Sequence, residues 1–234
     1  MLRRLFGVLV GLAVQGFFES GWRNTRLSPA LLKLALAATS LALVYLHGVL
    51  GALLVIASIS TLMLLSGEIL WTLALQTLSL APAAWASISS LAMSLLGVSP
   101  ITPWQALAIF VRFYAATIAI AYGLSTLNPY ELYTITSKLL GREKAFTILL
   151  IHRILPHGLT VFKNALEVNS IKRDPIAPSI AAATAALLEE ANETLTATTW
   201  RNKLTTSTRA KYSQKWTLAE LTTLTILLLA LQTL

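Results

Sequence analysis

Two arginines stand at the ends of the two polar helical stretches that the second half of the sequence predicts. Residues 157–173 end at Arg173 and residues 176–201 end at Arg201, with Asp174-Pro175 as the break between them. The helix dipole favours a cation at a helix C-terminus, and arginine presents a planar five-donor fork that matches carboxylates. The pattern indicates either two contact points for acidic groups of another protein or two ordinary solvent-exposed arginines.

Other residue types that carry chemistry do not form a recognisable site. The chain has no cysteine, which excludes thiol catalysis and disulfides. His152 and His157 are five residues apart and do not share a helix face, so we expect no metal site. No glycine-rich phosphate-binding loop is present. We therefore expect no cofactor and no catalytic residues.

The charge distribution points to a membrane. The 234 residues are 56% hydrophobic and 12% charged, against about 25% charged in an average soluble domain. Between residues 34 and 130 the only charged side chains are Glu68 and Arg112. Charged groups inside a membrane usually pair within the bundle, so these two are predicted to form an ion pair.

The elements follow from apolar runs, because a membrane-spanning helix needs about 20 apolar residues. They predict an all-α, polytopic membrane protein with about five spans, a short N-terminal in-plane or re-entrant helix and a cytoplasmic pair of helices. The predicted divisions are membrane helices over 1–137, cytoplasmic helices over 138–215 and a final span over 216–234. The predicted membrane segments are 5–18 (in-plane), 30–65 (two spans broken near His47-Gly48), 69–96 (one kinked span or a re-entrant pair, because of Pro82), 104–124 and 216–234.

Local signals fix several helix ends. Ser28 is predicted to cap a helix that has Pro29 at its first position, and Thr102 and Gln105 form a predicted capping box. A shorter amphipathic helix opens at Asn128-Pro129 and ends at Gly141. Trp71, Trp85 and Trp104 are predicted to anchor in the headgroup region.

Most of the 18 Lys and Arg lie between Lys138 and Lys215. Basic segments beside spans face the cytoplasm, so this region and residues 23–33 are predicted to be cytoplasmic, with the C-terminus outside. The protein is thus expected in the cell membrane. Nucleic-acid binding, which a net charge of +8 would also suit, is not expected because the charge is mixed and lies between membrane segments.

Six short patterns occur in order along the chain. They are Leu27-Ser28-Pro29…Lys33-Leu34, Thr126…Pro129…Glu131-Leu132, Arg153-Ile154-Leu155-Pro156, Arg173 seventeen residues after Pro156, Glu193 eight residues before Arg201, and Arg209…Tyr212, after which Glu220 opens the last span. In this order the chain resembles the transmembrane (T) component of energy-coupling-factor (ECF) transporters, including the cobalt-type members. It departs from the family signature at the neighbours of both arginines, where Lys172, Asp174, Trp200 and Asn202 replace alanine and glycine.

The resemblance implies a non-catalytic subunit of an ATP-driven importer of a vitamin or a transition-metal ion. Arg173 and Arg201 would each enter a groove on one of two ATPase subunits, and Arg153, Pro156, Glu193 and Arg209 would belong to the supporting coupling region. A separate substrate-binding membrane subunit would rest on the apolar faces of the helix pair. Two alternatives remain: a membrane-embedded hydrolase of phosphatase or protease type, using His152, His157 and Glu167, or a stand-alone carrier.

Overall fold

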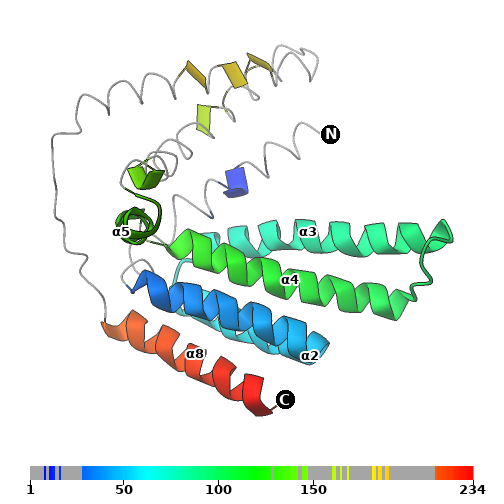
Figure 1. Ribbon diagram of the computed structural model, residues 1–234. Helices are drawn as coiled ribbons and strands as arrows, with labels where there is room; N and C mark the ends of the chain where they lie inside the picture. Colours follow the sequence, from blue (N-terminus) through cyan, green and yellow to red (C-terminus); the bar gives the residue numbers. More distant parts are fainter. Residues whose placement is uncertain are drawn as a thin grey trace. The chain divides into compact units, whose positions relative to one another are not determined.

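The computed structural model describes the four long apolar helices, one shorter helix and a few further positions. These residues are 8, 11–13, 16, 28–127, 129–141, 144–146, 160–161, 164, 168, 181–182, 184–185, 188–189 and 214–233. The helices are α2 (Ala30–Leu65), α3 (Ile69–Leu95), α4 (Pro103–Thr126), α5 (Pro129–Leu140) and α8 (Gln214–Thr233) (Figure 1). Every secondary-structure element among the described residues is a helix, as predicted.

The chain divides into two compact units. One contains residues 15–127 and 212–234, with helices α2, α3, α4 and α8, and is called the bundle below. The other contains residues 1–14 and 128–211, with helix α5. The second unit begins at residue 128, ten positions before the predicted boundary at 138.

Helix α2 is a hairpin whose reversal is made by one glycine. Gly48 has φ 61° and ψ −126°, a conformation that costs glycine little because it has no Cβ. A Cβ added to Gly51 would lie 2.3 Å from the Leu43 carbonyl oxygen, whereas in a straight helix these residues would be about 12 Å apart along the axis. The predicted break near His47-Gly48 is confirmed, and the chain turns back there on itself.

Helices α3 and α4 form an antiparallel pair. The Thr117 hydroxyl donates to the Ser79 carbonyl oxygen at 3.1 Å, and the Ser87 hydroxyl donates to that of Ala106 at 3.0 Å. Pro82 lies inside α3 without ending it, so of the two predicted alternatives the structure has the single helix and not the re-entrant pair. The capping box at the start of α4 is confirmed, with Thr102 N–H donating to Gln105 at 2.8 Å and Gln105 N–H to the Thr102 hydroxyl at 3.3 Å.

The last helix, α8, packs against α2 and completes the bundle. Near its end, the Leu231 carbonyl oxygen lies 3.2 Å from His47 Nε2. The centre of the bundle is a core of apolar side chains in which aliphatic residues of α2 meet aromatic and small residues of α3 and α4. Its fully buried members include Leu36, Leu43, Val55, Ile59, Leu62, Met63, Trp71, Leu75, Ala115, Ile118, Tyr122 and Leu227.

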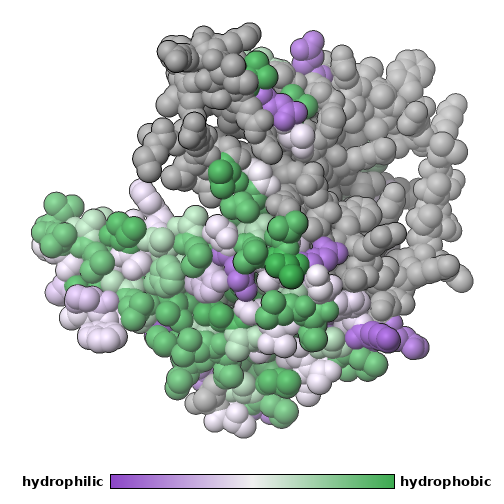
Figure 2. All heavy atoms as spheres, turned by 180° about the vertical axis from the view of Figure 1, so that it is seen from behind, coloured by the Kyte–Doolittle hydropathy of each residue, from purple (hydrophilic) through white to green (hydrophobic). Residues whose placement is uncertain are grey.

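The outer surface of the bundle is also apolar. Leucine, isoleucine and aromatic side chains are exposed along all four of its helices, and hydrophobic residues dominate the described face in Figure 2. Helices that are hydrophobic all round are typical of membrane spans. Each of the four is long and apolar enough to cross a bilayer. The bundle is therefore compatible with a membrane protein, as the composition predicted.

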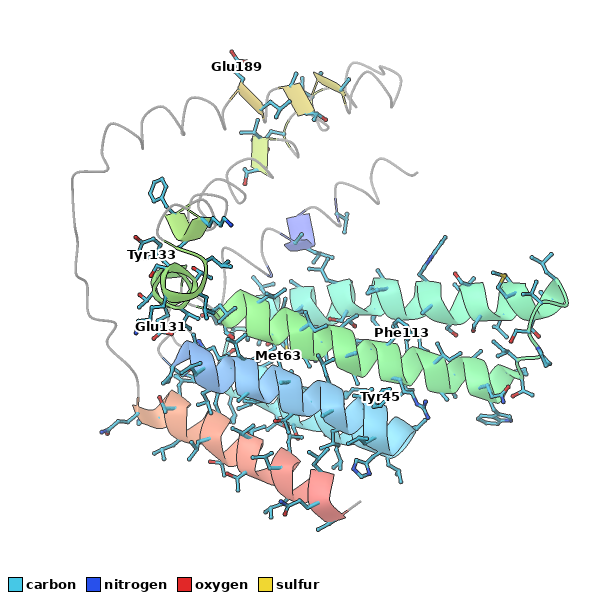
Figure 3. The ribbon with its side chains drawn as sticks, viewed as in Figure 1. Tyr45, Met63, Phe113, Glu131, Tyr133 and Glu189 are labelled. Carbon is cyan, nitrogen blue, oxygen red and sulfur yellow. The ribbon has the colours of Figure 1, made fainter. Side chains whose placement is uncertain are left out.

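The second unit contains the amphipathic helix α5. It starts at Pro129 and ends at Leu140 as predicted, followed by Gly141 with φ 88°. Glu131 stands in its first turn and Lys138 in its last (Figure 3 labels Glu131), where each charge complements the helix dipole. Of the predicted helix over residues 176–201 only six residues are described, and all are exposed, among them Leu188 and Glu189.

Candidate functional site

Five polar residues from three helices meet at one end of the bundle and are called the polar cluster. They are Ser28 just before α2, Lys33 in its first turn, Tyr122 and Thr126 at the end of α4, and Glu220 in α8. Each is at most 1% exposed. Lysine and glutamate are almost never fully buried unless they are paired. The burial of both in one place therefore makes this end of the bundle the candidate site.

Tyr122 joins α4 to α8 through the glutamate. Its hydroxyl donates to Glu220 Oε1 at 2.7 Å, a short distance typical of a hydrogen bond to a carboxylate. Behind it, the ring of Trp71 on α3 lies with its centroid 6.1 Å away at an angle of 52°. Such tilted aromatic pairs add packing energy beyond their buried area, so the tyrosine is held in one orientation.

Lys33 joins α2 to the end of α4. Its ammonium donates to the Thr126 carbonyl oxygen. Thr126 is the last residue of α4 and Leu127 is already extended, so this carbonyl is one of the four that a helix leaves without an intrahelical partner. The lysine therefore satisfies an orphan acceptor and places a positive charge at the negative end of the helix dipole.

Glu220 receives two further interactions from the start of α2. The Ser28 hydroxyl hydrogen-bonds to its carboxylate, and the Lys33 ammonium attracts it electrostatically. A buried carboxylate that loses its cation is strongly destabilising, whereas the matched pair is tolerated. The five residues therefore behave as one unit that ties α2, α4 and α8 together at this end.

The contacts within the cluster join the ends of three helices. Within the described ranges, no three His, Cys, Asp or Glu residues come together as a metal site. The Tyr122 hydroxyl and the Lys33 ammonium are both engaged with acceptors. The arrangement can fix the positions of the helix ends relative to one another. The chain segments that enter and leave the bundle at this end are then rigidly connected.

The structure does not bring Glu68 and Arg112 together. In the antiparallel α3–α4 pair, Ser79 lies opposite Thr117, and Arg112 lies beyond that point, on the side away from Glu68. Glu68 precedes Ser79 by about 16 Å of helix. Arg112 instead contacts Gly48, at the far end of the α2 hairpin.

Two further local predictions were wrong. Pro29, not Ser28, is the N-cap of α2, and no side chain caps that end; Ser28 is drawn inward by Glu220. Trp71 is fully buried, because its ring fills the space behind Tyr122. Trp85 and Trp104 are exposed, at 75% and 79%, as anchoring at a membrane surface requires.

Most of the predicted coupling residues lie outside the described ranges. These are Arg153, Pro156, Arg173, Glu193, Arg201 and Arg209, together with His152, His157 and Glu167 of the hydrolase alternative. Their prediction rests on the sequence.

The polar cluster itself was not foreseen as a unit. A signal did exist: Lys33 and Glu220 are isolated charges near the starts of two apolar helices, and such charges inside spans usually face a partner. The sequence gives no indication that these two residues, 187 positions apart (220 − 33), belong to the same cluster.

Fold and cluster together define an all-helical protein with four long apolar helices compatible with a membrane, tied at one end by a cluster of buried polar residues that includes a lysine and a glutamate. Comparison with protein families, with curated proteins and with solved structures finds no match.

Proposed function

We propose that this chain is the transmembrane coupling subunit of an ECF-type importer in the cell membrane. It transmits the nucleotide-driven movement of two ATPase subunits to a substrate-binding membrane subunit, for uptake of a vitamin or a transition-metal ion. The chain itself is not an enzyme in this proposal, because the energy comes from ATP bound to its partners.

The observation that carries the proposal is the convergence of three of the family-like segments. The Ser28–Lys33 segment, the Thr126 segment and Glu220 resemble the family at widely separated places in the sequence. In the bundle they interact directly, through the Lys33–Thr126 hydrogen bond and the Ser28–Glu220 contact. Chance similarities in sequence have no reason to meet in space, so this meeting supports the resemblance.

The path of the chain is in keeping with the same proposal. With each half of α2 as one crossing, the bundle makes five passes, and residues 28, 66–68, 127 and 214 share one end. Residues 128–213, which hold most of the basic side chains, then leave and return at that end. By the positive-inside rule this end is cytoplasmic, the side on which ATPases work.

Arg173 and Arg201 carry the coupling in this proposal. Each presents its guanidinium to carboxylates in a groove of one ATPase subunit, and Arg153, Pro156, Glu193 and Arg209 support the two helices. Lys33 and Glu220 make the entry and exit of this segment move together with α4. A tilt imposed on the arginines then reaches the membrane helices as a rigid movement.

Co-purification tests the proposal. The tagged chain, extracted from its native membrane, should bring down two nucleotide-hydrolysing subunits and one further membrane protein. The double variant Arg173→Ala, Arg201→Ala should lower recovery of the ATPases by tenfold or more, since truncating one partner of a buried charge pair costs about 2–5 kcal/mol.

A matched control removes two exposed cations elsewhere, with Lys138→Ala and Lys215→Ala, and should leave recovery unchanged. Equal recovery from the arginine variant and the wild type would contradict the proposal. So would substrate transport by the purified chain alone in liposomes, which would favour the stand-alone carrier.

A further inference from the structure

Arg112 lies in a pocket at the reversal of α2, at the end of the bundle opposite the polar cluster. The pocket has a volume of about 460 Å³ and is lined by Arg112 and residues 45–50. A Cβ on Gly48 would lie 2.5 Å from a guanidinium nitrogen of Arg112. Only a glycine at the reversal therefore leaves room for the arginine to lie against the backbone.

The guanidinium has no counter-charge in the part of the chain that the structure describes. Glu68, the acid of the predicted pair, lies at the start of α3, at the end of the bundle away from Arg112. No hydrogen bond or ion pair of Arg112 occurs among the described residues. An exposed arginine at membrane depth that lacks an internal partner is available to an external anion.

The surroundings of the pocket show what kind of anion it would meet. Tyr45 is 86% exposed and neighbours Leu46 and Leu50, both also exposed; Figure 3 labels Tyr45 near the end of the first half of α2. Along α4, Arg112 lies about 21 Å from Thr126, so in a hydrocarbon layer about 30 Å thick it is in the leaflet away from the polar cluster. The side chain can extend from there to the headgroup level.

The backbone adds donors of the right kind. The second half of α2 begins directly after Gly48, and the first N–H groups of a helix have no intrahelical acceptor. Residues 45–47, at the end of the first half of α2, line the same pocket. The free carbonyl groups of that end and the free N–H groups of the following helix start both border the pocket, and the arginine fork supplies its net positive charge. Helix starts combined with arginine are suited to phosphate oxygens, which accept several donors at once.

We propose that this pocket is a binding site for a phosphate group, held by the Arg112 guanidinium against the start of the second half of α2. The group is the phosphodiester of a phospholipid headgroup in the outer leaflet or a soluble phosphate from the same side. The inference depends on membrane insertion of the bundle with this end facing outside, and not on the coupling function.

Lipid retention by the purified full chain tests the site. In a non-ionic detergent, phosphatidylglycerol and a diacylglycerol with the same acyl chains are titrated separately, and retained lipid is counted by native mass spectrometry. The wild type should retain phosphatidylglycerol in preference to diacylglycerol. In Arg112→Gln the preference should fall by about tenfold or more, the change expected for loss of a charge-assisted hydrogen bond.

Two controls separate the site from general charge and from misfolding. Lys215→Gln removes the same charge from the exposed start of α8 and should retain the lipid like the wild type. Arg112→Lys keeps the charge but loses the fork, and should fall between wild type and Arg112→Gln. Thermal unfolding midpoints of the three variants show whether each remains folded.

A second arm distinguishes the sources of the phosphate. If inorganic phosphate at millimolar concentration displaces the lipid from the wild type, the site takes soluble phosphate; if only phosphatidylglycerol binds, it is a headgroup site. Equal phosphatidylglycerol retention by folded Arg112→Gln and wild type, with no Arg112-dependent binding of inorganic phosphate, would overturn the proposal.

Discussion

At the scale of single residues, burial separates the two kinds of charge in the bundle. Lys33 and Glu220 are fully buried in one polar cluster, where the lysine attracts the carboxylate electrostatically, whereas Arg112 is exposed at the opposite end. A buried charge with a partner costs little as long as both remain, and a lone charge needs an outside ligand. Lys33 and Glu220 are therefore expected to affect the stability of the bundle, and Arg112 is expected to affect binding.

Removing only the cation of the polar cluster should be far worse than removing both charges. Lys33→Met leaves the Glu220 carboxylate buried without its partner, and we expect a loss of about 3–5 kcal/mol in the free energy of unfolding. In the double variant Lys33→Met, Glu220→Leu most of this loss should be recovered. Unfolding by titration with a denaturing detergent, followed by circular dichroism, measures both.

Tyr122→Phe supplies the internal comparison, since it deletes only the hydroxyl that donates to Glu220. The expected loss is about 1–2 kcal/mol, smaller than that of Lys33→Met, because hydrogen bonds between membrane helices are worth little. Equal losses for the double variant and for Lys33→Met alone would show that the ion pair does not govern the stability of this end.

At the scale of elements, the α2 hairpin depends on a close approach of its two backbone segments. Gly51 has no room for a side chain, because its Cβ would lie 2.3 Å from the Leu43 carbonyl oxygen, and backbone cannot rotate away as a side chain can. At Gly123, by contrast, the nearest atom to an added Cβ is that of Ala37, at the ordinary contact distance of 3.5 Å.

These two glycines form a matched test. Gly123→Ala should leave stability unchanged or raise it by up to about 1 kcal/mol, the difference in helix propensity. Gly51→Ala should lower it by about 1–3 kcal/mol, the usual cost of overpacking, because the two halves of α2 must separate. If the two variants unfold at the same denaturant concentration, the hairpin is not closed as described.

Elements were also the scale at which sequence was most informative. The α4 capping box, the end of α5 at Gly141 and the break at Gly48 all depend on residues within a few positions of one another, so their signals are local. Lys33–Thr126 and Tyr122–Glu220 join residues 93 and 98 positions apart. Ser28 and Trp71 were misassigned for the same reason: a local role was available, and the partner that overrode it lay on another helix.

At the scale of the whole molecule, the two ends of the bundle differ in what they offer. One end has the buried ion pair and the two chain connections to residues 128–213; the other has the α2 reversal, the α3–α4 connection and the end of α8. A membrane around the apolar surface would separate the ends completely. Coupling to ATPases requires the end with the polar cluster to face the cytoplasm, and binding of an outer phosphate requires the end with the α2 reversal to face outside. A single orientation of the bundle satisfies both requirements.

Introduced cysteines can establish that orientation, because the chain contains none of its own. A membrane-impermeant maleimide added to intact cells should label Val98→Cys, in the α3–α4 connection, and Gln232→Cys, near the end of α8. Ile69→Cys at the start of α3 and Lys138→Cys on α5 should react only after permeabilisation. All four positions are exposed on the chain, so a difference in labelling reports the membrane side rather than burial.

Ala52→Cys serves as the control, since this position is fully buried and should stay unlabelled in both conditions. External labelling at both Val98 and Ile69 would mean that α3 does not cross the membrane, and external labelling at Lys138 would place the basic segment on the wrong side for ATPases. The coupling proposal could not survive the second result, whereas the phosphate site depends only on Val98 and Gln232 reacting from outside.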